Sequence, residues 1–98
     1  MIATEDRLAH ALETAVDDIE FSLDAASVDF EVMTSPNTSQ YIIVYAEGER
    51  HAYVTAEMGA DSVPVVLVDI YSVNAAGEER WVHGDLTIDA AIPYIINA

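Results

Sequence analysis

The sequence contains no lysine and no cysteine, and its only basic side chains apart from histidine are three arginines. The absence of cysteine excludes a disulfide framework, a cysteine-based zinc site and a thiol nucleophile. The shortage of cations argues against direct binding to nucleic acid or to an anionic membrane, because both need basic residues that displace counterions. We therefore expect neither nucleic acid nor a membrane as a direct partner.

Long hydrophobic runs are also absent. No apolar stretch approaches the length of a membrane span, and the N-terminal residues lack the basic start and apolar run of a signal peptide. We therefore expect a soluble protein of the cytoplasm, or of the host cytoplasm if the protein is viral.

Acidic side chains are abundant. Eighteen aspartates and glutamates give a formal net charge of −15, while 52% of the 98 residues are hydrophobic. This apolar content is enough to offset chain entropy, so we expect one folded domain over residues 1–98. Two explanations of the acid excess remain open, a surface that binds a basic protein and a general adaptation to a salty cytoplasm.

The fold is predicted to centre on the segment 64–73, whose apolar residues occupy both odd and even positions. This β-branched pattern is typical of a strand that is covered on both faces at the centre of a sheet. An apolar stripe at a period near 3.6 predicts an amphipathic helix over 5–24. Short connections favour an antiparallel meander. The other predicted strands are 28–33, 40–46, 51–56 and 80–83. We therefore expect an α+β fold, with the N-terminal helix packed on a mostly antiparallel sheet of about five strands.

The remaining segments are a turn and an ambiguous C-terminus. The composition of 35–39 indicates a turn. The apolar spacing after Asp85 suits a helix capped by Asp85 or Thr87, but Pro93 would break or kink it. We expect a short C-terminal helix to about Ile92, followed by a tail that packs on the core.

Carboxylates form a second stripe along the predicted N-terminal helix, away from the apolar one. Phe21 projects close to this stripe and nearly opposite the core stripe. Either another segment of the chain covers Phe21, or it is exposed and contacts a partner. The acidic residues of the stripe are Asp6, Glu13, Asp17, Glu20 and Asp24.

The first predicted strand alternates in polarity, as expected of a strand with one wet face. Its inward residues are Val28, Phe30 and Val32, and its outward residues are Asp29, Glu31 and Met33. Acidic groups therefore continue from the helix onto this strand, beside an exposed methionine.

No motif for catalysis or for metal binding is present. The histidines His10, His51 and His83 are far apart and lack the spacing of zinc ligands. Asp17 and Asp18 lie in a helical pattern rather than in a calcium-binding loop. No nucleophile elbow or phosphate-binding glycine loop occurs. We expect no cofactor, no metal and no enzymatic activity. The tryptophan and the tyrosines are either interface anchors or cross-strand packing groups.

An acidic helix, the acidic strand Asp29-Phe30-Glu31-Val32-Met33 and a meander resemble the phage uracil-DNA glycosylase inhibitors, which imitate DNA. The meander contributes Val54-Thr55-Ala56-Glu57, Pro64-Val65-Val66-Leu67-Val68 and Gly77-Glu78-Glu79. The likeness spans about half of the chain, and it departs from the family in lacking a clear second acidic helix. It implies that Asp29 and Glu31 stand in for phosphates and that Met33 borders an apolar contact with the enzyme.

These patterns predict a small, acidic, non-enzymatic protein that binds and inhibits a basic protein, such as a nucleic-acid-binding enzyme. This class includes anti-defence, immunity and DNA-mimic proteins. The alternative is a halophile-adapted structural or oligomerising domain without an inhibitory role, and a homodimer is compatible with either. The predicted partner-binding residues are Asp6, Glu13, Asp17, Glu20, Phe21, Asp24, Asp29, Glu31 and Met33.

Overall fold

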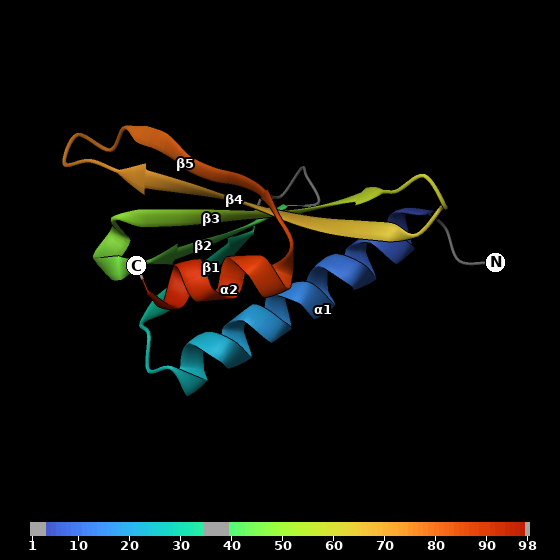
Figure 1. Cartoon of the computed structure of the whole chain (residues 1–98), viewed down its shortest axis with the longest axis horizontal. Coiled ribbons are helices and arrows are strands. Elements are labelled where there is room, and N and C mark those ends of the chain that lie inside the picture. The colour runs from blue at the N-terminus through green and yellow to red at the C-terminus, as the bar shows by residue number, and fades with distance from the viewer. Residues whose placement is uncertain (1–3, 35–39, 98) are drawn as a thin grey trace.

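The computed structural model describes residues 4–34 and 40–97, with side chains from Arg7 onward. The chain has an α+β fold in which a helix, a five-stranded antiparallel sheet and a second helix follow one another (Figure 1), as the sequence predicts. The elements are α1 (Thr4–Ala25), β1 (Phe30–Thr34), β2 (Gln40–Tyr45), the 3-10 turn η1 (Ala46–Gly48), β3 (Arg50–Met58), β4 (Pro64–Val73), β5 (Glu79–Leu86) and α2 (Ile88–Ile96). The turn predicted at 35–39 lies outside the described residues.

Each strand pairs with its neighbours in sequence, in the order β1-β2-β3-β4-β5. All four pairings are antiparallel, which confirms the predicted meander. The predicted central position of segment 64–73 is wrong by one strand, because β3 is the middle strand and β4 lies beside the edge strand β5. The other edge strand is β1, which follows α1 in the sequence.

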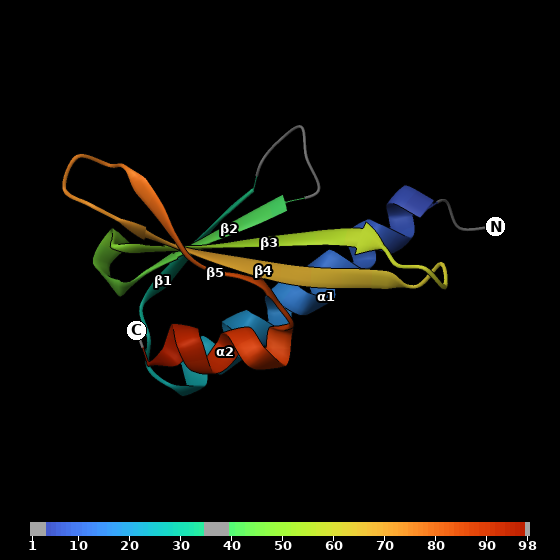
Figure 2. The same cartoon turned by 45° about the horizontal axis from the view of Figure 1, so that its top comes forward.

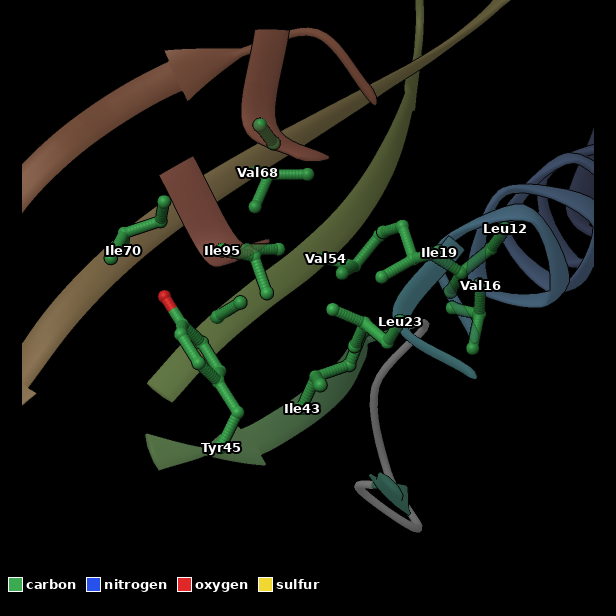
Figure 3. Close-up of a cluster of buried hydrophobic side chains, with 12 residues drawn as sticks. Leu12, Val16, Ile19, Leu23, Ile43, Tyr45, Val54, Val68, Ile70 and Ile95 are labelled. Atoms are coloured by element: carbon green, nitrogen blue, oxygen red, sulfur yellow. The ribbon is translucent and has the colours of Figure 1, made fainter. Parts of the chain in front are cut away.

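Both helices pack on one face of the sheet (Figures 1 and 2). The apolar stripe of α1 meets the sheet as predicted, and Ile19 and Leu23 are fully buried. α2 contributes Ala91 and Ile95 to the same core. Figure 3 shows side chains of both helices in one cluster with the sheet residues that point toward the helices. The buried sheet residues are Ile43, Tyr45, Ala52, Val54, Val68 and Ile70.

The opposite face of the sheet is not covered by any described helix or strand (Figures 1 and 2). Along β4, Val68 and Ile70 point into the core, whereas Leu67 and Tyr71 lie on the other face and stay partly exposed. The prediction that both faces of this strand are covered is therefore wrong for the single chain. The two helices cover only one face of the sheet, so the apolar residues of β4 on the other face have no helix packed on them.

The C-terminal helix extends further than the sequence predicts. Thr87 is its N-cap, and its side-chain oxygen accepts a hydrogen bond from the Ala90 amide at 3.3 Å. The helix continues through Pro93 to Ile96 instead of ending near Ile92. A proline in a helix removes one backbone hydrogen bond, but the burial of Ile95 two residues later favours continuation. Among the described helices, none is long and apolar enough to cross a membrane.

Candidate protein-binding surfaces

The central part of the predicted acidic stripe lines a groove beside the edge of the sheet. Glu13 and Asp17 are exposed on α1, and Glu20 is half-buried one turn further along. Together with the apolar residues Val16, Val32 and Tyr41 they surround a groove of about 270 Å³ between α1 and the β1–β2 pair. Three carboxylates above an apolar floor suit a cationic side chain with an aliphatic stem, such as lysine or arginine.

The outer side of α1 carries Phe21, which is 77% exposed. No described segment covers Phe21. Of the two predictions for this residue, cover by another segment is therefore wrong, and Phe21 is exposed. Asp24 is also exposed, near the C-terminal end of α1. Asp6 belongs to α1, but its side chain lies outside the described part of the structure.

The predicted residues of the first strand do not join the α1 groove. Glu31 and Met33 alternate with the inward-facing Phe30 and Val32, so they lie on the uncovered face of the sheet. Asp29 is exposed just before β1 and lines a second groove of about 210 Å³ with Glu31 and with residues near η1. The structure thus places the predicted binding residues in two groups, on opposite sides of the edge strand β1.

The arginines lie away from the α1 groove. The guanidinium of Arg7 donates a hydrogen bond to the Ser62 carbonyl at 3.0 Å, and Arg50 and Arg80 lie in β3 and β5. Among the side chains described from Arg7 onward, the only pair within salt-bridge distance is His51 Nδ1 and Glu79 Oε1 at 3.2 Å. The carboxylates of the groove thus have no described cationic partner inside the chain.

Sequence reasoning missed a further surface, the uncovered sheet face. We use this name for the outward residues of all five strands, which are largely apolar on β2 and β4 and mostly polar on β3 between them. The Tyr53 and Tyr71 rings pack against each other at a centroid distance of 5.1 Å, and Trp81 on β5 is 61% exposed. The apolar residues of the uncovered sheet face are Met33, Ile42, Val44, Tyr53, Val65, Leu67, Tyr71 and Trp81. The sequence signal for this surface is the occurrence of apolar residues at both odd and even positions of β4.

A polar network crosses the same face. Glu79 Oε1 accepts a hydrogen bond from the Tyr53 hydroxyl at 2.5 Å and contacts His51 Nδ1 at 3.2 Å. Burial, reinforced by the hydrogen bond to Glu79, raises the pKa of Tyr53 to about 12. Asp69 Oδ1 accepts from the Asp85 backbone amide at 3.0 Å. These contacts engage two carboxylates of the face, Glu79 and Asp69, within the chain.

A smaller hollow of about 190 Å³ lies near the C-terminal end of α2, lined among others by Tyr45, Arg50 and His83. The Tyr45 hydroxyl is buried and, among the described residues, has no hydrogen-bond partner. Figure 3 shows this hydroxyl directed toward the strand that carries Ile70. Burial raises the pKa of Tyr45 to about 12, against the opposing effect of the Arg50 charge. No group of three or more potential metal ligands occurs among the described residues.

The chain matches no protein-family model, no curated protein and no solved structure.

Proposed function

We propose that this chain is a small acidic, non-enzymatic protein that binds and inhibits a basic protein, with nucleic-acid-binding enzymes as the first candidates. The observation that carries the proposal is the α1 groove, where Glu13, Asp17 and Glu20 surround an apolar floor. A basic side chain of the partner would place its aliphatic stem on Val32 and Tyr41 and its charge among the carboxylates.

Charge and exposure support this proposal. The net charge of −15 would speed encounter with a cationic surface, because complementary fields raise association rates. Phe21, exposed beside the groove, would supply apolar contact after encounter. Inhibition follows if the cationic site that is occupied is the one that the enzyme uses for nucleic acid.

Uracil-DNA glycosylase is the first enzyme to test, because the sequence resembles the phage inhibitors of that enzyme. In this reading Asp29 and Glu31 imitate phosphates at the edge strand, and Met33 contacts an apolar part of the enzyme. Asp29, Glu31 and Met33 are exposed, as such a role requires.

The experiment compares two charge reversals of equal size. Asp17→Lys/Glu20→Lys changes the α1 groove, and Asp61→Lys/Glu78→Lys makes the same change in two exposed turns. Association with a panel of purified basic nucleic-acid-binding enzymes, beginning with uracil-DNA glycosylase, is followed by stopped flow at low salt, together with enzyme activity. We expect the groove variant to associate about tenfold more slowly than the turn variant.

Two results would contradict the proposal. One is the absence of binding to every enzyme of the panel. The other is an equal effect of both reversals, which would mean that only the total charge matters and not the groove.

One observation favours the alternative, a halophile-adapted domain whose acids hold water and ions. Exposed carboxylates also occur far from the groove, including Asp61, Glu78 and Asp89. This alternative predicts a fold that requires molar salt and an α1 groove without binding activity. The salt dependence of folding, argued in the Discussion, separates the two functions.

A further inference from the structure

The uncovered sheet face is the feature that the proposed function does not use, apart from Glu31 and Met33 at its edge. An antiparallel sheet with one solvated face normally presents alternating polar residues there. Here the corresponding positions of β2 and β4 are largely apolar, with Ile42 and Val44 on β2 and Val65, Leu67 and Tyr71 on β4. The strand between them, β3, presents Tyr53 together with polar residues. Such a face calls for a cover that one chain does not supply.

We infer that a second copy of this chain covers the uncovered sheet face, giving a dimer of four layers in the order helix, sheet, sheet, helix. Two sheets that pack face to face lie about 10 Å apart and interdigitate their side chains. A two-fold axis through the interface would bring the same surface of both copies together, so the apolar residues of one sheet face would meet those of the other.

The size of the face fits a stable dimer. β3 and β4 contain 9 and 10 residues, which corresponds to about 30 Å at about 3.4 Å per residue. Five strands at a spacing of about 4.8 Å span about 20 Å. Because β1, β2 and β5 are shorter, with 5, 6 and 8 residues, the face measures about 500 Å² in projection. An interface of standard size buries roughly 800 Å² of accessible surface per partner, so a dimer would use nearly the whole face.

The charges of the face also favour a second copy over a basic partner at this site. Glu79 and Asp69 already accept hydrogen bonds from Tyr53 and from the Asp85 amide. Glu31 lies on the edge strand, and Glu57 lies next to the last residue of β3. Two carboxylates of the face are thus already engaged within the chain, whereas the apolar residues of β2 and β4 have no cover and match the same residues of a second copy. What opposes association is the long-range repulsion of two chains of charge −15, which salt screens.

This repulsion gives the dimer a distinctive salt dependence. Added salt weakens a complex between the acidic chain and a basic partner, but it strengthens an apolar association between two acidic chains. The sign of the salt effect therefore separates this inference from the proposed function, and either can fail without the other.

Trp81 reports on the interface directly, because it is the only tryptophan of the chain and belongs to the uncovered sheet face. A Cβ at Gly84 would lie only 2.7 Å from Trp81 Nε1, so the glycine is what allows the indole to lie against β5. Burial of this exposed ring in a dimer would shift its fluorescence emission to shorter wavelength.

The experiment measures molecular mass by sedimentation, together with Trp81 emission, from dilute buffer to molar potassium chloride. Leu67→Asp places a charge at the centre of the face. Phe21→Asp is the matched control, since it makes the same kind of change on the exposed side of α1. We expect the wild type and Phe21→Asp to dimerise more tightly as salt increases, and Leu67→Asp to raise the dissociation constant at least about tenfold.

A second variant guards against misfolding of Leu67→Asp. Trp81→Ser removes a side chain that is 61% exposed, so the fold should tolerate it, and it should also weaken the dimer. A wild type that stays monomeric at all salt concentrations would overturn the inference. So would a dimer that Phe21→Asp disrupts while Leu67→Asp and Trp81→Ser leave it intact.

Discussion

Tyr45 combines two properties that are rarely found together, a side chain at the centre of the core and a hydroxyl without a described partner. An unsatisfied buried hydroxyl costs about 1–3 kcal/mol, because the group loses its hydrogen bonds to water and gains none. The ring itself is buried in the core cluster, so the penalty belongs to the oxygen alone.

Replacing Tyr45 by phenylalanine keeps the ring and removes this oxygen. We expect the free energy of unfolding at pH 7 to rise by about 1 kcal/mol, measured by chemical denaturation. Tyr41→Phe is the control, because Tyr41 is a partly exposed tyrosine of the same strand. A loss of stability in Tyr45→Phe would mean that the hydroxyl has a partner in solution.

Tyr45 and Tyr53 also make stability sensitive to alkaline pH. Their pKa values are raised from 10.0 to about 12, so above pH 10 the folded chain keeps phenol protons that the unfolded chain releases. Stability therefore falls as the pH rises from 10 to 12 and is unaffected by these groups below pH 10. Tyr45→Phe should make this fall shallower, as measured by unfolding at several alkaline pH values. An unchanged slope would argue against the shift at Tyr45.

At the scale of elements, α2 depends on its first turn, because Pro93 removes a hydrogen bond further along. Thr87→Ala deletes the cap on the Ala90 amide and should lower the free energy of unfolding by about 1 kcal/mol. Thr87→Ser keeps a hydroxyl and should retain most of the stability. Thermal unfolding of both variants checks this, and equal losses would show that the methyl group matters rather than the cap.

Elements with a local signal could be predicted, and those that depend on distant contacts could not. The helix α1 and the alternation of β1 follow from periodicity within a few turns or residues. The extension of α2 past Pro93 depends on the burial of Ile95 against other elements. Similarly, the sequence identified Glu13, Asp17 and Glu20 as one stripe, but their grouping with Tyr41 depends on how α1 lies along the sheet.

The pattern of β4 indicates that both of its faces are in contact, but it does not indicate which element covers each face. Apolar residues at odd and even positions do indicate contacts on both faces. The described part of the chain, however, contains only two α-helices, and where they pack is decided by tertiary structure. If a second copy buries the uncovered sheet face, β4 is covered on both faces in the dimer, although it is covered on only one face in the monomer.

At the scale of the whole molecule, the net charge of −15 opposes compaction. We expect the chain to be folded in dilute buffer, as the binding function requires, and to gain about 5 °C in melting temperature on addition of molar potassium chloride. Circular dichroism measures the melting temperature at each salt concentration. The variant Leu67→Asp is measured in parallel, because it removes the contribution of dimerisation to the melting temperature. A chain that is unfolded without molar salt would support the halophilic alternative.

The positions of the three arginines make the folded chain a poor substrate for trypsin, which cleaves after lysine and arginine. Arg7 lies in α1, and Arg50 and Arg80 lie in strands that are paired with their neighbours. A protease needs an extended, unpaired segment, so cleavage at the two strand sites has to wait until the sheet opens. The same scarcity of basic residues that shapes the surface thus leaves trypsin almost nothing to cut while the protein is folded.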